Sequence, residues 1–220
     1  MTERNRPKVG ADNAGNDDPR SALRRRDRGK NEDWVRSFLE AAPYGFLATV
    51  DDEGQPFLNS NLYVYDRDRH CVYLHTHRTG RTRANLAEPE KVAFSVAGMG
   101  RLLPAPEALE FSIEYAGVTC FGTGRLVEDE AEAKQALQML LDKYAPHLEA
   151  GRDYRPTTDD ELAQTTVYRV NVEAWSGKQK EVEIDFPGAF DLPTLPVPFP
   201  ARGASDAGSS SEGDAGPGGS

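Results

Sequence analysis

Cysteine and long apolar runs are the two features that this sequence has least of. Only 2 of its 220 residues are cysteine, and Cys71 and Cys120 each lie inside an apolar, strand-like segment. A disulfide framework normally uses more cysteines in a smaller secreted chain, so we expect two buried thiols. No apolar run approaches the ~20 residues that a membrane-spanning helix needs. The charged N-terminus is not followed by the apolar segment of a signal peptide. These absences predict a cytoplasmic protein with no membrane partner.

Positive charge is also in the minority. The chain has 26 lysines and arginines against 36 aspartates and glutamates, a formal net charge of −10 at pH 7. Nucleic-acid binding normally needs a basic footprint, so we expect no nucleic-acid partner. Hydrophobic residues make up 38% of the chain. They can build a core, and the length allows one domain or a small two-domain protein.

The two ends of the chain have few residues that could join a core. Residues 1–32 are polar and include an arginine-rich run at 24–28, and the chain from about residue 184 is rich in proline, glycine and serine. Such segments bury too little apolar surface to offset the entropy of ordering them. We therefore expect disordered tails over 1–32 and 184–220 and one folded domain over 33–183. The arginine run could also contact an acidic partner or the acidic domain of this chain, and the sequence leaves this alternative open.

Between the predicted tails, alternating apolar and polar residues predict strands separated by turns. The predicted strands are residues 44–50, 57–65, 70–76, 91–97, 114–127 and 167–175. Gly117, Gly122 and Gly124 would permit a sharp bend or bulge in the fifth of these. Residues 98–113 hold two glycines and two prolines with no regular period, which predicts a long loop and a candidate wall of a substrate pocket.

Helices are predicted outside these strands. Apolar residues at helical spacing follow Asp33, and Asp129 with Glu132 marks the start of a second helix. Thr158 and Glu161 form a capping box for a third, short one. Together, these strands and helices predict a mainly β (β+α) protein. A six-stranded antiparallel split β-barrel with peripheral helices accounts for them, because closing the sheet removes its exposed edges.

The turn after the third predicted strand collects hydroxyl and cationic side chains. From His75 to Arg83 the chain reads HTHRTGRTR and then leads into a helix. Unpaired backbone N–H groups and the helix dipole at such a place favour an anion, which makes the turn a candidate phosphate site. A solvated helix start whose arginines contact nothing would have the same pattern, so spacing alone leaves both readings open.

Several motifs together resemble a known family. In chain order they are ATVDxxGxP at 48–56, VYLHT at 72–76, GR at 80–81 and NLxxP at 85–89. Their order and spacing resemble the FMN-binding split barrel of pyridoxamine 5′-phosphate oxidase-like proteins. Two later motifs, YxxVxxFGxGRLV at 115–127 and WSGK at 175–178, are similar to the nitroimidazole reductase branch of that superfamily. The resemblance covers residues 34–181.

This resemblance implies a homodimer with one FMN in each of two clefts between the barrels. The cofactor-binding positions of the family carry over onto Asn59, Ser60, Asn61, Leu62, His75, Thr76, Arg81 and Thr82. Trp175 and Lys178 lie where the family often brings late residues near the flavin, in some members from the partner chain.

One position departs from the family pattern, which usually has a lysine where this chain has Thr82. A hydroxyl supplies no charge, and charge-assisted hydrogen bonds to phosphate are about twice as strong as neutral ones. Arg81 and Arg83 are placed to compensate, because a guanidinium can bind phosphate through two parallel hydrogen bonds.

The function that the resemblance implies is an FMN-dependent oxidoreductase that reduces a small flat acceptor, nitroaromatic or quinone-like, with NADH or NADPH as candidate donor. No Ser/His/Asp or Cys/His constellation is visible, so the chemistry would belong to the cofactor. His75 and His77 lack a third ligand nearby, and no metal is expected. Phe111 and Tyr115 could stack on a substrate or pack in the core. Two alternatives remain: a non-catalytic module that binds flavin, deazaflavin or haem, and a purely structural dimer.

Overall fold

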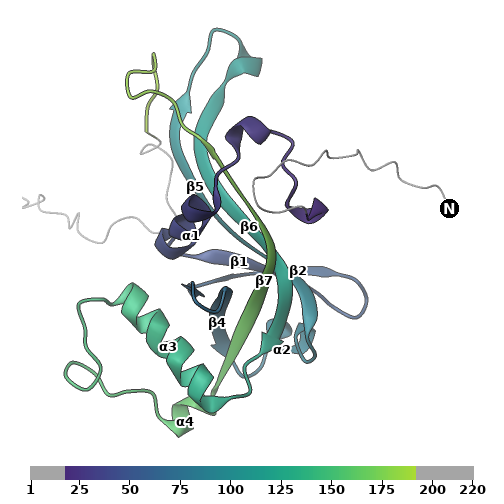
Figure 1. The fold of residues 1–220 in the computed structure, drawn as a ribbon, viewed down its shortest axis with the longest axis vertical. Coiled ribbons are helices and arrows are strands. Elements are labelled where there is room, and N and C mark those ends of the chain that lie inside the picture. The colour runs from purple at the N-terminus through teal and green to yellow at the C-terminus, as the bar shows by residue number, and fades with distance from the viewer. Residues whose placement is uncertain (1–17, 192–220) are drawn as a thin grey trace, which may run out of the picture.

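One antiparallel sheet forms the centre of the computed structural model, which describes residues 18–191 (Figure 1). Its strands are β1 (Gly45–Val50), β2 (Pro56–Asn61), β3 (Tyr63–Asp66), β4 (Cys71–His77), β5 (Glu90–Leu103), β6 (Ser112–Leu126) and β7 (Thr165–Lys180). The α-helices are α1 (Glu32–Ala41), α2 (Arg81–Asn85), α3 (Glu130–Tyr144) and α4 (Asp159–Leu162). The short 3-10 helices are η1 (Pro19–Ser21), η2 (Arg26–Arg28) and η3 (Ala108–Glu110).

The sheet curls into a split barrel because its two edge strands are neighbours in the chain. The strand order is β2-β1-β5-β6-β7-β4-β3, and only Leu62 separates β2 from β3. Within the described residues no ladder joins β2 to any strand except β1, so the barrel is not closed by hydrogen bonds. The predicted mainly β barrel with peripheral helices is confirmed. The strand number is seven rather than six, because the predicted strand 57–65 breaks at Leu62.

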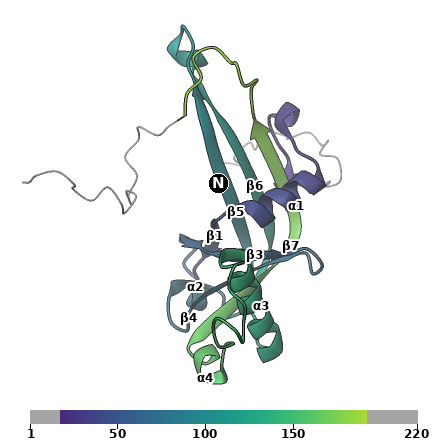
Figure 2. The ribbon, with the colours of Figure 1, turned by 90° about the vertical axis from the view of Figure 1, so that its left-hand side faces the viewer.

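The predicted loop over residues 98–113 is wrong. β5 and β6 continue as a paired hairpin, and only residues 104–111 connect them. Pairing persists as far as Leu103 opposite Ser112, with one irregularity between Met99 and Leu102. The Arg101 guanidinium lies 2.8 Å from a Glu114 carboxylate oxygen, and this ion pair joins the two strands of the hairpin. Figures 1 and 2 show the hairpin projecting away from the end of the molecule that carries α3 and α4.

The structure also differs from the predicted tails where it describes them. Ser21 is buried and Gly29 forms a bridge to β7. At the other end Phe190 bridges to Leu102 of the hairpin, and Arg101 donates to the carbonyl oxygen of Val182. Residues 1–17 and 192–220, the remainder of the predicted tails, lie outside the described residues.

Two hydrophobic cores lie on opposite faces of the curled sheet. The main one fills the barrel interior, where α1 packs onto the strands; its fully buried members include Leu39, Leu47, Tyr63, Phe94, Val118 and Tyr168. The second lies under α3, whose Ala133, Ala136 and Leu140 pack on β3, β4 and β7. Asp129 caps α3 as predicted, and Thr158 and Glu161 form the predicted capping box.

Both cysteines are free and buried, as predicted. Burial raises the pKa of the Cys71 thiol, and it raises that of Cys120 to about 12. Neither thiol is therefore ionised near neutral pH.

A bulge lies beside the glycines of β6, but its extra residue, Glu173, belongs to the partner strand β7, because Phe121 pairs with Ala174 and Gly122 with Val172. The glycines of β6 thus allow a close approach to the bulge rather than forming it. The register of β6 against β7 shifts between Phe121 and Gly122. A Cβ atom at Gly122 would lie 1.8 Å from the carbonyl oxygen of Asn171, which no side chain can tolerate without a shift of the β7 backbone. Only glycine fits at this close approach of two strands.

Replacing Gly122 tests this packing. We expect Gly122→Ala to lower the free energy of unfolding by about 1–3 kcal/mol or more, since overpacking against backbone forces strain into both strands. Gly98→Ala is the matched control, because a Cβ there would meet nothing nearer than the Phe38 ring at 3.9 Å. Urea denaturation of the two variants measures the difference. Equal stability would contradict the bulge geometry.

Candidate functional site

Two strand edges without a ladder partner face each other where the barrel is split. β2 pairs only with β1, and β3 pairs with β4 only as far as Leu74. His75, Thr76 and His77 thus extend beyond β3 with one free edge. The Asn61 side-chain amide crosses the gap and donates to the His75 carbonyl oxygen at 3.5 Å. We call this region the seam: residues 56–61 of β2, residues 75–77 of β4, and the adjoining α2.

Asn61 leaves one hydrogen-bonding group of the seam unsatisfied. Its side-chain carbonyl oxygen Oδ1 is buried and has no hydrogen-bond partner among the described residues. Leaving a buried acceptor unpaired costs about 1–3 kcal/mol, and native proteins avoid it. A donor from outside the described chain, such as an N–H group of a ligand, would satisfy this oxygen.

Asn59 and Thr82 are joined inside the seam. The Asn59 amide donates to the Thr82 hydroxyl oxygen at 3.1 Å, and Thr82 is only 3% exposed. The hydroxyl therefore points into the protein rather than toward solvent. Its role in the structure is to orient Asn59 beside the unsatisfied Asn61.

Arg81 is the exposed cation at this end of the seam. Its guanidinium carbon lies 5.1 Å from the centre of the Phe57 ring, a cation–π contact that leaves its N–H groups available. α2 spans only five residues, so little dipole adds to the charge of Arg81. The predicted phosphate site at this turn thus rests on side chains rather than on the helix.

Thr76 and His75 end β4 on the other side of the seam. The Thr76 hydroxyl donates to the His77 carbonyl oxygen at 2.9 Å, so the Tyr168 hydroxyl 2.8 Å away must be the donor to Thr76. Sequence reasoning did not identify Tyr168 as a neighbour of the site, because only the β4–β7 register places it there. The His75 side chain is exposed, yet desolvation by the surrounding protein lowers its pKa.

The side chains of the other four predicted cofactor-binding residues do not gather at the seam. Ser60 faces the outside of the sheet opposite Phe46 of β1, and Leu62 is exposed between β2 and β3. Trp175 packs inside, with its ring centre 4.5 Å from that of His70. Lys178 lies on the outer side of β7, with its ammonium 5.6 Å from the centre of the Tyr115 ring.

Two of the predicted residues, Trp175 and Lys178, therefore belong to other regions of the described chain. Within the described residues, no hydrogen bond or ring contact joins Trp175 or Lys178 to the seam. Tyr115, a candidate for substrate stacking, instead accepts a hydrogen bond from Arg28 at 2.8 Å. Phe111 is exposed in the segment that joins β5 to β6.

The lowered pKa of His75 predicts a pH dependence. The unfolded chain binds a proton at this residue near its ordinary pKa of about 6.5, and the folded protein binds it only at lower pH. Stability is therefore complete above pH 6.5 and declines as the pH falls below it. The same direction applies to His70, whose pKa is lowered mainly by burial. An NMR titration should give midpoints below 6.5 for both rings; higher midpoints would contradict the desolvation.

Several solved structures are similar to this chain in fold. No curated protein matches the sequence. Among solved structures, the flavocytochrome Anf3 from Azotobacter vinelandii is similar, with a TM-score of 0.66 and 20% identity over 87% of this chain and 94% of that one. The FAD and haem binding protein from Mycobacterium smegmatis has a TM-score of 0.64 and 24% identity over 80% and 92%.

A third solved structure is also similar in fold. It is a candidate 5-nitroimidazole antibiotic resistance protein from Bacteroides thetaiotaomicron, with a TM-score of 0.57 and 20% identity over 69% of this chain and 89% of that one. At these identities the likeness concerns the fold. The family sequence model described as pyridoxamine 5′-phosphate oxidase matches residues 31–179, which include the whole sheet except the last residue of β7. This chain therefore belongs to the pyridoxamine 5′-phosphate oxidase family.

Proposed function

We propose that this protein is a flavin-dependent oxidoreductase that holds its flavin along the seam, at the interface of a homodimer. Its substrate would be a small flat acceptor, nitroaromatic or quinone-like, with NADH or NADPH as electron donor. The observation that carries the proposal is the buried Asn61 carbonyl oxygen, which has no partner among the described residues. It lies where two strand edges leave backbone groups unpaired.

The residues of the seam fit a flavin ring. The pyrimidine edge of an oxidised isoalloxazine carries one N–H group between two carbonyl groups, which suits a strand edge and an amide acceptor. The bond from Asn59 to Thr82 holds a second amide in place beside Asn61. The redox chemistry would come from the bound flavin, while the chain binds it, orients it and excludes water.

The phosphate end depends on Arg81. Thr82 stands at the family's lysine position, but its hydroxyl is buried and already accepts a hydrogen bond. Arg81 is exposed beside Phe57, and a guanidinium can bind phosphate through two parallel bonds. We infer that arginine replaces lysine as the source of positive charge in this chain.

A homodimer would cover an apolar outer face and complete the site. Phe46 and Val50 of β1 and Leu58 of β2 are exposed on the outside of the sheet, and Leu62 extends this apolar area. Contiguous apolar surface of this kind marks an interaction site. Lys178 is remote from its own seam, so it would reach a flavin in the seam of a second copy.

A second candidate function follows from the names of two similar structures. One is a flavocytochrome and the other an FAD and haem binding protein. This chain would then bind flavin or deazaflavin together with haem, or haem alone, as a module without turnover. His75 and His77, both exposed at the end of β4, are the imidazoles within the seam. A haem absorption spectrum of the purified protein would favour this candidate.

The first test removes the predicted phosphate contacts. We expect the double variant Arg81→Gln, Thr82→Val to lose flavin affinity by at least tenfold, because a hydrogen bond to a charged group contributes about 1.5–3 kcal/mol. Titration followed by flavin fluorescence measures the change. Thr82→Val alone accounts for any effect of leaving Asn59 unpaired, and Arg78→Gln is a surface control on the same turn. Unchanged flavin retention in the double variant would remove the phosphate assignment.

The second test addresses the dimer. Leu58→Glu places a charge on the outer face at a residue that is 66% exposed in the single subunit. We expect this variant to become monomeric and to lose flavin affinity together. Leu109→Glu is the matched control, because Leu109 is 90% exposed at the far end of the hairpin. Analytical ultracentrifugation gives the oligomeric state. A dimeric Leu58→Glu variant with normal flavin content would contradict the proposed interface.

A further inference from the structure

The end of α3 holds the first residue of β3 by its backbone. The Tyr144 hydroxyl accepts a hydrogen bond from the Tyr63 N–H group and donates one to the Tyr63 carbonyl oxygen, each at 3.0 Å. Tyr63 directly follows Leu62, the link between β2 and β3. We propose that Tyr144 and its neighbour Lys143 are positioning residues of the seam: they fix the bend between β2 and β3 and thereby the place of Asn61. This inference rests on the proposed function, because the seam is the proposed flavin site.

The Tyr144 hydroxyl takes the place of a partner strand at this point. The ladder with β4 occupies one edge of Tyr63, opposite Leu74, so the hydroxyl binds the other edge, where no described strand pairs with β3. The β1–β2 ladder ends two residues earlier, at Gly45 opposite Asn61. Tyr63 is fully buried, and one hydroxyl satisfies both a backbone donor and a backbone acceptor there. Tyr144 thus holds the chain where its pairing with β1 has stopped.

Lys143 connects the same residue to the end of α1. Its ammonium donates to the carbonyl oxygen of Ala42, the C-cap of α1, at 2.9 Å and lies 3.8 Å from the centre of the Tyr63 ring. The Tyr63 hydroxyl in turn donates to the carbonyl oxygen of Leu39 in α1. Burial lowers the pKa of Lys143 to about 8, whereas a lysine that only covered the surface would keep its ammonium in water. Tyr63 is therefore held at its backbone, its ring and its hydroxyl.

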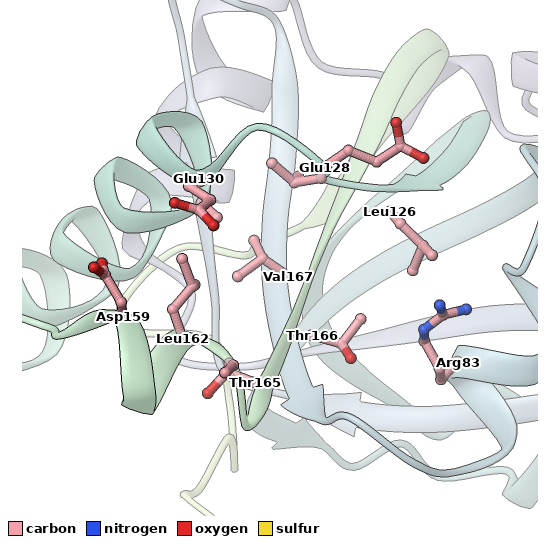
Figure 3. Close-up of a pocket in the computed structure, with 12 residues that line it drawn as sticks. Arg83, Leu126, Glu128, Glu130, Asp159, Leu162, Thr165, Thr166 and Val167 are labelled. Atoms are coloured by element: carbon pink, nitrogen blue, oxygen red, sulfur yellow. The ribbon is translucent and has the colours of Figure 1, made fainter.

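The start of α3 packs less closely than its end. A pocket of about 350 Å³ lies between the start of α3, α4 and the start of β7, and Figure 3 shows Glu130 of α3 and Asp159 of α4 beside it. At the other end of the helix, Lys143 and Tyr144 contact Tyr63 directly. The end of α3, rather than its start, is therefore the part of the helix that can hold the seam.

Asn61 depends on this bend because it lies two residues before Tyr63. Its side-chain amide donates across the gap to the His75 carbonyl oxygen at 3.5 Å, while its buried Oδ1 has no partner among the described residues. A mobile asparagine side chain would rotate until this oxygen met a donor. Supporting residues prevent such a change when they hold the neighbouring backbone in place, even though they do not contact the ligand.

The experiment removes the Tyr144 hydroxyl and keeps the ring. Flavin-free protein is titrated with FMN and, in parallel, with FAD, and binding is followed by flavin fluorescence. We expect Tyr144→Phe to bind flavin roughly tenfold more weakly than the wild type, or weaker still, as when outer contacts of other binding groups are lost. Lys143→Met, which keeps the side-chain length without the charge, should weaken binding in the same direction. Tyr154→Phe is the matched control and should bind normally, because the Tyr154 hydroxyl accepts from Gln138 of α3 at 2.7 Å.

Two further measurements separate positioning from a general loss of stability. Leu140→Ala leaves a cavity under α3, so it should lower the urea midpoint. It should leave flavin affinity unchanged, because Leu140 and Tyr63 belong to different cores. NMR of the flavin-free protein should show shifted Asn61 side-chain amide resonances in Tyr144→Phe and unshifted ones in Tyr154→Phe.

Two results would overturn the positioning role and leave the proposed function standing. One is wild-type flavin affinity in Tyr144→Phe, and the other is an equal loss of affinity in Leu140→Ala. If the wild type binds neither flavin, the proposed function is wrong, and the Asn61 amide then decides the positioning role alone: an unmoved resonance overturns it. Should circular dichroism show that Tyr144→Phe does not fold, Lys143→Met carries the same comparisons.

Discussion

The one-residue link at Leu62 is the constraint on which the rest of the structure depends. It joins the two edge strands of a seven-stranded sheet, so the sheet has to curl until those edges meet. Curling creates an interior, which α1 and the aromatic residues Tyr63 and Phe94 fill. It also leaves β2 and the end of β4 facing each other without a ladder. The candidate site therefore exists because these strand edges of the sheet meet without pairing.

Much of the fold could be predicted from the sequence, because side-chain alternation and capping residues are local signals. The break at Leu62 could not, since Leu58, Leu62 and Val64 share one face of a single alternating pattern and no turn residue interrupts it. β3 differs from β2 because α3, more than sixty residues later, covers its outer face. The loop expected over 98–113 was wrong for a similar reason. Its glycines and prolines are unfavourable for an isolated strand, but pairing with β6 and the contact of Arg101 with Glu114 stabilise it.

The candidate site was predictable in its residue types and less so in its geometry. The resemblance pointed to Asn59, Asn61 and Thr82, and the structure joins Asn59 to Thr82 and places Asn61 beside them. The direction of the Thr82 hydroxyl depends on an asparagine 23 positions earlier, which no local pattern reveals. Tyr168 meets the site only through the register of β4 against β7. Trp175 and Lys178 are close in sequence, yet one lies inside the sheet and the other outside.

The burial of both cysteines has a consequence for the proposed redox function. Oxidants and alkylating agents attack the thiolate form, and the raised pKa values of Cys71 and Cys120 keep both side chains protonated. Peroxide formed when a reduced flavin meets oxygen would therefore find no reactive thiolate at Cys71 or Cys120. The scarcity of cysteine, together with its placement, thus protects both thiols from by-products of the proposed reaction.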